Sequence, residues 1–335
     1  MEEHTGEIDL KPHKEKAVVR VIGIGTAGWR IAERMADDNP QGIELFSIGS
    51  DMKTNLPLEA YKTKLIALKK KETDGDLASG SDSEEAAALD RESEEKIKSA
   101  IRGSDMVIIT CGEGGSTGTA VSPLVAHEAR TLGILTAAVV VRPFAFEQRA
   151  EIAQRGIERL EKEADAIIVI DADNLAFKMD EYKELTPSQF FSTLENVAVS
   201  AIKALTVFQD NCVNTSFKDV KNLLKDAGII FFGMGLAKGE NGGANATRHA
   251  TRSNFVGETI NGATKVICTM YISKDVGMRE ISGSLKEIQN AVAPEAQIFF
   301  GVIVDRSLEE AETIRVTVVA SDFQRKSKPK IGLPL

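Results

Sequence analysis

Two glycine-rich segments of this chain each follow an apolar run that has the character of a buried strand. The first, GIGTAG at Gly23–Gly28, belongs to the run AVVRVIGIG, and the second, CGEGGSTGTAVSP at Cys111–Pro123, follows MVIIT. Residues at helical spacing come after each segment, so both are predicted to be strand–glycine–helix units. Such units build parallel sheets with right-handed crossovers, and their loops gather at the carboxyl ends of the strands.

The rest of the chain extends this pattern and then changes it. Strand and helix signals alternate through five repeats, interrupted by a segment at 62–83 that is expected to be an irregular loop. We therefore predict an α/β fold with a doubly wound parallel sheet, followed by a long central helix and a smaller α+β domain. The expected limits are a mobile N-terminal arm at 1–16, a nucleotide-binding domain at 17–185, a connecting helix at 186–211, an α+β domain at 212–322 and a flexible tail at 323–335.

Composition excludes several classes of function. The chain has 335 residues, enough for two domains, and a net charge of −9, which argues against non-specific binding to nucleic acid or to an anionic membrane. Its three cysteines form no CxxC pair, its four histidines form no cluster, and no apolar run has the length of a membrane span. We expect a cytoplasmic protein with reduced thiols and no zinc site.

Glycine loops at the start of a helix are suited to binding phosphate. Glycine lets backbone N–H groups approach phosphate oxygens without a Cβ in the way, and the helix that follows adds partial positive charge. GxGxxG alone is also typical of tight strand–helix packing and of dehydrogenases, for which no catalytic His or Lys stands out here. The second loop has no Walker lysine, so phosphates there would be held by amides and by the hydroxyls of Ser116, Thr117 and Thr119. Two such loops on one sheet predict a nucleotide.

At this point the motifs resemble the tubulin/FtsZ superfamily, and FtsZ more closely than tubulin. The family signature GGGTG[TS]G is similar to GGSTGTA here, with Ser116 and Ala120 in place of glycines. Further similar segments occur in the family's order: LASGSDSEEA, RPFAFE, ADAIIVIDADNL, VNTSFKDVKNLL and RVTVVAS. The resemblance covers roughly Val18–Asp322.

The resemblance implies a GTPase that binds GTP or GDP with Mg²⁺ and assembles head-to-tail with copies of itself, in cell division or cell shape. No nucleic acid is expected as a partner, and a membrane is expected only indirectly, through an unknown adaptor. No cluster of metal-ligating side chains is expected. The nucleotide contacts it implies are Gly25, Thr26, Ala27, Gly28, Arg30, Ser79, Gly80, Gly112, Gly114, Gly115, Ser116, Thr117, Gly118, Thr119, Glu147, Arg149, Phe191 and Asn196.

Catalysis is expected from a different segment. The family's loop NxDxx[DE] matches Asn214–Asp219, so Asn214, Ser216 and Asp219 are the implied catalytic residues, supplied to the nucleotide of a neighbouring subunit. A helix of about 24 residues spans roughly 36 Å, which is too far for Asp219 to reach its own subunit's loops. Asp219 is equally suited to cap the helix that follows it.

This sequence departs from the family pattern at several positions, which leaves alternatives open for the catalytic activity and for the base contact. Ser216 replaces a carboxylate, which favours slow hydrolysis or, as the alternative function, a filament-forming nucleotide-binding protein with little GTPase activity. Ala172 stands where FtsZ usually has Asn.

Glu195 is the alternative to Asn196 as the base contact beside Phe191, because the alignment of the central helix can slip by one residue. Glu113 is the only residue of the two glycine loops with an acidic side chain.

Overall fold

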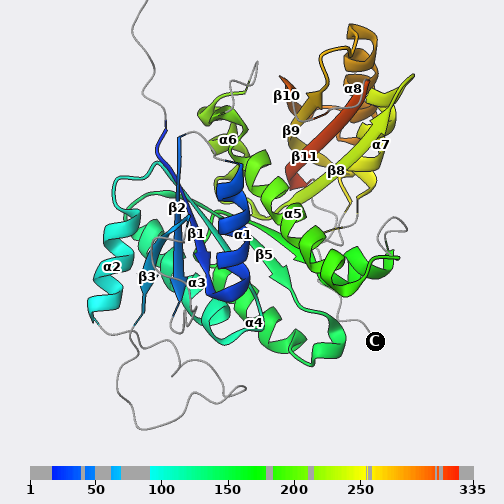
Figure 1. The fold of residues 1–335 in the computed structure, drawn as a ribbon. Coiled ribbons are helices and arrows are strands. Elements are labelled where there is room, and N and C mark those ends of the chain that lie inside the picture. The colour runs from blue at the N-terminus through cyan, green and yellow to red at the C-terminus, as the bar shows by residue number, and fades with distance from the viewer. Residues whose placement is uncertain are drawn as a thin grey trace, which may run out of the picture.

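The computed structural model describes residues 17–38, 42–49, 62–68, 91–178, 184–209, 215–253, 255, 259–305, 308 and 312–323. Two sheets lie on either side of a long helix, α5 (Pro187–Leu205), which runs diagonally between them in Figure 1. The arrangement confirms the predicted fold class: a doubly wound parallel sheet, a central helix and a smaller α+β unit.

The first sheet has the strand order β3-β2-β1-β4-β5-β6-β7, and every described pair in it is parallel. The order reverses between β1 and β4, where Ile24 pairs with Cys111, so the two glycine loops leave adjacent strands at the same edge. The strands are β1 (Val19–Ile24), β2 (Ile43–Gly49), β3 (Lys64–Ala67), β4 (Met106–Gly112), β5 (Leu135–Arg142), β6 (Ala166–Asp171) and β7 (Gly228–Ile229).

Helices cover both faces of this sheet because its strands alternate apolar side chains to each side. On one face α1 (Gly25–Asp37) and α5 share a core, to which they contribute Ile31 and Ile202. On the other face α2 (Arg91–Ile101), α3 (Ser116–Thr131) and α4 (Ala150–Glu161) contribute Ile97, Val125 and Ile157. Fully burying an aliphatic side chain of this size contributes roughly 1.5–3 kcal/mol.

One element was mispredicted. The sequence indicated an irregular loop from residue 62, but Lys64–Ala67 forms strand β3, which pairs in parallel with β2 at the edge of the sheet. Ile66 and Leu68 are buried there, and the nearby lysine run had concealed this short apolar pattern.

The central helix begins where the sequence predicted. Thr186 caps it in a reciprocal arrangement with Gln189, whose side chain accepts from the Thr186 N–H at 3.0 Å, and Pro187 occupies the first turn. The α-helix ends at Leu205, earlier than expected, and a short 3₁₀ turn at Val207–Gln209 follows.

The second sheet has the order β10-β9-β11-β8, with β9 and β10 parallel and the other pairs antiparallel. Phe232 and Val319 of this sheet belong to the same core as α5, so the two sheets are packed through the helix. The elements are α6 (Phe217–Leu224), β8 (Phe231–Lys238), α7 (Gly242–Arg252), β9 (Ala263–Ile272), α8 (Met278–Ala291), β10 (Gln297–Val304) and β11 (Thr313–Phe323). None of the helices described is both long and apolar enough to cross a membrane.

Candidate nucleotide-binding site

A cavity of about 500 Å³ lies where the glycine loops leave β1 and β4. The loops form one side of it, the segment after β5 forms another, and the first turns of α5 close the end. Its lining consists of Ile24, Gly25, Thr26, Ala27, Arg30, Ile31, Gly112, Glu113, Gly115, Ser116, Thr117, Gly118, Val141, Arg142, Pro143, Phe144, Glu147, Arg149, Ala172, Phe191, Leu194 and Glu195. A position at the carboxyl ends of parallel strands, at the point where strand order reverses, is the usual ligand site of such a sheet.

In the first glycine loop, two glycines have different tasks. Gly25 has a φ of +69° and lines the cavity, so it provides the left-handed turn from strand to helix. Gly28 lies outside the cavity lining. A Cβ on Gly28 would overlap the carbonyl oxygen of Thr110 on β4, so this glycine lets α1 pack directly against the sheet.

In the second loop the N-terminus of α3 points its first amides toward the cavity. Gly115 is the N-cap residue and has no side chain to accept from these amides, which leaves them for a ligand. Of the three predicted hydroxyl residues, Ser116 and Thr117 line the cavity. Thr119 is buried and accepts from the Gly114 N–H at 2.8 Å, so it closes the loop from behind.

The predicted ribose segment follows β5. Glu147 and Arg149 both line the cavity and both are exposed at its rim. Glu147 accepts from the Phe144 N–H at 3.1 Å in a short 3₁₀ turn, which fixes the direction of its carboxylate. The Cβ and backbone carbonyl of Arg149 lie beside Gly114, so Arg149 is adjacent to the second glycine loop.

At the other end of the cavity α5 contributes Phe191, Leu194 and Glu195. Asn196 is not part of the lining; its side-chain oxygen accepts from Arg34 of α1 at 3.1 Å. Of the two residues that the sequence offers as the base contact, Glu195 lines the cavity and Asn196 does not; the base contact itself stays a prediction. Leu194 was missed, although its spacing of three from Phe191 is the signal that both lie on one face of the helix.

Glu113 is an acid enclosed behind the second loop. Its side chain is 3% exposed, and its Oε1 accepts from Cys111 Sγ and from Ser122 Oγ, both at 3.3 Å. Its Oε2 is buried without a hydrogen-bond partner among the described residues and faces Gly156 of α4, where a Cβ would overlap it. Burial raises the pKa of this carboxyl and also that of the Cys111 thiol beside it.

Two of the predicted catalytic residues lie away from the cavity, and three predicted site residues, Ser79, Gly80 and Asn214, fall outside the described residues. Ser216 and Asp219 lie at the start of α6, and in Figure 1 this helix is at the opposite end of α5 from the turn between β1 and α1. Of the residues that the structure describes, no three His, Cys, Asp or Glu side chains are grouped as metal ligands.

The fold and the cavity together define a nucleotide-binding protein of the doubly wound type. Comparison with family models matches residues 18–180 to the GTPase domain of the tubulin/FtsZ family and residues 228–324 to the FtsZ C-terminal domain. The chain belongs to the tubulin/FtsZ family and is an FtsZ-like GTPase.

Among curated relatives, cell division protein FtsZ of Aquifex aeolicus is 35% identical over 91% of this chain and 83% of its own length. Cell division protein FtsZ 1 of Archaeoglobus fulgidus is 33% identical over 92% of this chain and 83% of its own. Among solved structures, an empty FtsZ dimer from M. jannaschii superposes with a TM-score of 0.80 at 29% identity, covering 96% of each chain.

Substitution of Gly115 by valine tests the cavity directly. The nearest described atom that a Cβ here meets, chain neighbours aside, is the Gly112 carbonyl oxygen at an ordinary 3.6 Å, so the fold accommodates it. We expect Gly115→Val to weaken GTP binding at least about tenfold, since the branched side chain stands between the ligand and the α3 amides. Equilibrium binding of a labelled guanine nucleotide measures this.

The matched control is Gly277→Val. Gly277 is the N-cap of α8, with φ −84° and ψ 162° against −88° and 150° at Gly115, and it lies in the second domain. Both variants carry the same N-cap cost of about 1 kcal/mol. If Gly115→Val binds as tightly as Gly277→Val, the cavity does not hold phosphate at α3.

Glu113 gives a pH dependence of stability. Because its pKa is raised in the folded protein, the unfolded chain ionises first, and the free energy of unfolding falls as the pH rises from about 4.5 through the raised value. Glu113→Gln should remove this component, so the free energy of unfolding of this variant should fall less between acid and neutral pH than that of the parent. Denaturant unfolding at pH 5 and pH 8 measures it, with exposed Glu158→Gln on α4 as the control. Equal pH slopes in all three proteins would contradict the assignment.

Proposed function

We propose that this chain binds GTP with Mg²⁺, assembles head-to-tail into filaments and hydrolyses the nucleotide at the contact between subunits. The observation that carries the proposal is the distance between the cavity and Asp219, the carboxylate that the family resemblance assigns to catalysis. The cavity lies at one end of α5, and Asp219 lies at the other. The 19 residues of α5 span about 28 Å, so no side chain at its far end reaches the cavity of the same subunit.

The nucleotide would lie along the cavity with its phosphates at the two glycine loops. Amides at the starts of α1 and α3 would hold phosphate oxygens, and the hydroxyls of Ser116 and Thr117 would add donors. Glu147 would accept from the ribose hydroxyls, as the family resemblance implies. Arg149 would offset phosphate charge.

The base would lie between Phe191 and the face of α1. Guanine has two adjacent donors, the N1–H and the 2-amino group, and a carboxylate is the side chain that accepts from both. Glu195 is the carboxylate of α5 in the cavity lining, which supports guanine over adenine as the base. Ala172 lies in the same lining and has no polar atom to contribute from its side chain.

The hydroxyls of Ser116 and Thr117 line the cavity and are oxygen ligands, the kind that Mg²⁺ prefers. No group of carboxylates that could hold the ion is present among the described residues. These donors fit an ion carried mainly by the phosphates and water. When bound, the ion would offset the negative charge of the phosphates.

Asp219 is held in a fixed direction at the start of α6. Its Oδ2 accepts from the Ser216 N–H at 2.8 Å and from the Ser216 Oγ at 2.6 Å, which is a reciprocal capping box. Ser216 thus orients the carboxylate that the family resemblance assigns to catalysis. Phosphoryl transfer depends on positioning and charge, so a carboxylate oriented in this way suits the placing of an attacking water.

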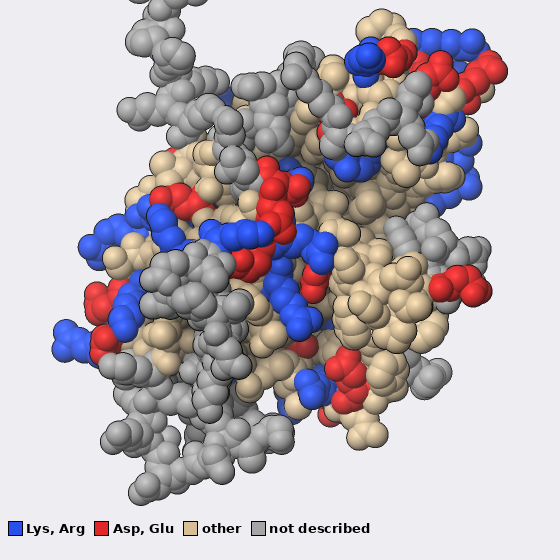
Figure 2. Space-filling model, in the orientation of Figure 1, with Lys and Arg blue, Asp and Glu red and all other residues tan. Residues whose placement is uncertain are grey.

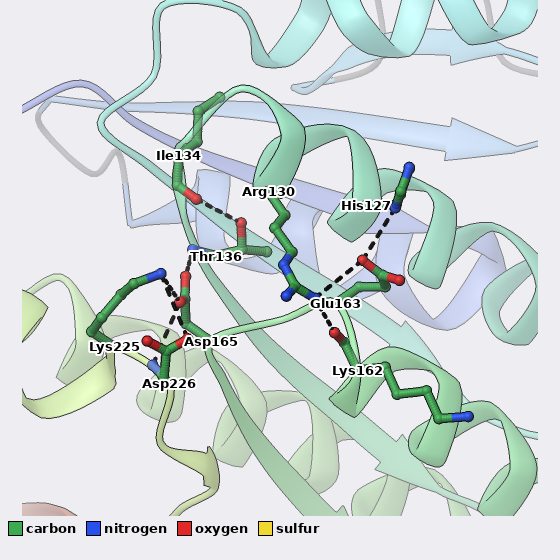
Figure 3. A network of polar contacts seen from close by, with 9 residues as sticks. All are labelled: His127, Arg130, Ile134, Thr136, Lys162, Glu163, Asp165, Lys225 and Asp226. Atoms are coloured by element: carbon green, nitrogen blue, oxygen red, sulfur yellow. Dashed lines mark hydrogen bonds and ion pairs between the residues drawn. The ribbon is translucent and has the colours of Figure 1, made fainter.

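The other end of α6 is fixed to the first sheet. Asp165, at the start of β6, accepts from Lys225 Nζ at 2.6 Å and from the Thr136 N–H at 2.9 Å, as Figure 3 shows. Ser321 of β11 also donates to the Leu223 carbonyl at 2.7 Å. Because both domains hold α6, a neighbouring subunit would meet Asp219 on a rigid support.

The alternative function is a filament with little GTPase activity, which Ser216 favours because it replaces a carboxylate. The cellular role that we propose is in cell division or cell shape, with any membrane contact made through an adaptor. The two functions differ in one measurable quantity, the rate of phosphate release from assembled protein.

Phosphate release as a function of protein concentration tests the proposal. We expect turnover to appear above a threshold concentration and Asp219→Asn to lower it about 100-fold or more, since this variant keeps the capping oxygen and removes the charge. Nucleotide binding at low protein concentration should be unchanged.

The control is Asp226→Asn, which removes a charge just after the other end of α6, at an exposed residue whose φ of 52° suits Asn. Parental turnover in Asp219→Asn, or equal loss in both variants, would contradict a catalytic carboxylate at Asp219. Filaments that form with GTP but release no phosphate in the parent would favour the alternative function.

Mixing two defective variants tests whether the site is shared. At a GTP concentration that fills the parent cavity but not the weakened one, Gly115→Val carries little nucleotide and keeps Asp219, whereas Asp219→Asn binds nucleotide but lacks the carboxylate. At mixed contacts an intact cavity meets an intact Asp219, so we expect the mixture to recover up to about a quarter of parental turnover, the share of ordered contacts that are complete. Recovery should be absent when either variant is assayed alone at the same total concentration. No recovery in mixtures that sediment together would exclude a shared site.

A further inference from the structure

Arg34 lies one turn behind the cavity, on the face of α1 that meets α5. Ile31, three residues earlier, lines the cavity, whereas Arg34 reaches across to the central helix. Its Nε and Nη2 donate to Glu195 Oε2 at 3.0 and 2.8 Å. Its Nη1 donates to Asn196 Oδ1 at 3.1 Å, and Nη2 also donates to Ser192 Oγ at 3.1 Å.

The three acceptors lie on one face of α5, at spacings of three and four residues. A planar guanidinium is the side chain that can bind all three at once, because its donors are fixed in one plane. The Glu195 side chain is 18% exposed and that of Arg34 is 35% exposed, so the pair is partly withdrawn from water and less screened than a surface ion pair.

The Arg34 contact occupies one of the two oxygens of the Glu195 carboxylate. Both Arg34 bonds to Glu195 fall on Oε2, while the Glu195 side chain belongs to the cavity lining. A glutamate on a helix surface has several rotamers, and a ligand that needs one of them must restrict the others. Arg34 makes that restriction in advance, which lowers the cost of recognition on binding.

We propose that Arg34 is a positioning residue for purine recognition, which holds Glu195 by Oε2 so that its Oε1 accepts from the N1–H and the 2-amino group of guanine. The proposal rests on the proposed function, in which Glu195 contacts the base. The proposal also gives Asn196 a role. This residue, which the sequence predicts as a base contact, is one of the acceptors that hold Arg34.

The α1–α5 contact offers a matched control. Lys203 of α5 and Asp38, just after α1, form an ion pair of 2.7 Å across the same two elements. In Figure 2 acidic and basic side chains lie side by side over this region of the molecule. Lys203→Ala therefore removes an ion pair between the same elements without touching Glu195.

The experiment compares GTP with ITP, whose hypoxanthine base lacks the 2-amino group. Both are titrated by displacement of a labelled guanine nucleotide at protein concentrations below assembly, in the parent and in Arg34→Ala, Arg34→Lys, Lys203→Ala and Glu195→Gln. We expect the parent to prefer GTP by about tenfold or more, the value of a hydrogen bond to a charged acceptor. Arg34→Ala should lower the ratio to about threefold or less, Arg34→Lys should restore it in part, and Lys203→Ala should keep the parental ratio.

The outcomes separate two failures. An unchanged ratio in Arg34→Ala, together with a reduced ratio in Glu195→Gln, overturns the positioning role and leaves Glu195 as the base contact. An unchanged ratio in Glu195→Gln overturns the base contact itself, and with it the proposal for Arg34. An equal reduction in Arg34→Ala and Lys203→Ala means that α1–α5 packing as a whole sets the ratio, and this also overturns the specific role of Arg34. Because the readout is a ratio of two ligands on one protein, a general loss of folded protein cancels.

Discussion

The close packing of α1 against the edge between β1 and β4 is the constraint on which the site depends. A Cβ on Gly28 would overlap the Thr110 carbonyl oxygen, and a Cβ on Gly23 would overlap the Gly28 carbonyl oxygen. Only glycine permits this approach, which brings the start of α1 beside the start of α3. Two helix N-termini then face one cavity, so their partial charges add at the place where phosphates are expected. The GxGxxG pattern is therefore partly a packing motif and partly a ligand motif.

The fold class was predictable from the sequence because strand–glycine–helix units leave few alternative topologies. The loops were predictable because glycine and hydroxyl residues at a helix start are typical of turns that bind anions. Strand β3 was not, since a run of four residues beside lysines has no distinctive period. Asn196 and Glu195 could not be separated either, because a shift of one position turns a helical residue by 100° and only the packed structure fixes that rotation.

Two residues near the expected sites have physical roles that the sequence did not reveal. Ser216 replaces a carboxylate in the catalytic loop, yet it is the N-cap of α6 and holds Asp219 by two donors. Glu113 lines the cavity, and its buried carboxyl is enclosed between Cys111, Ser122 and Gly156. Burial raises the pKa of this carboxyl above its ordinary value.

The central helix α5 connects the cavity at its start with α6 at its end. At its start it carries Phe191 and Glu195 in the cavity, and Arg34 fixes it to α1; at its end it leads into α6, which Asp165 fixes to β6. A ligand that draws α1 and α5 together would therefore act on a helix that buries one face, from Phe190 to Leu205, in the core shared with both sheets. Such a helix moves as a rigid body more readily than it bends, because its packed side chains resist local displacement. Under the proposed function, a rigid-body shift of α5 would act at both of its ends, on the cavity and on the region of α6 that carries Asp219.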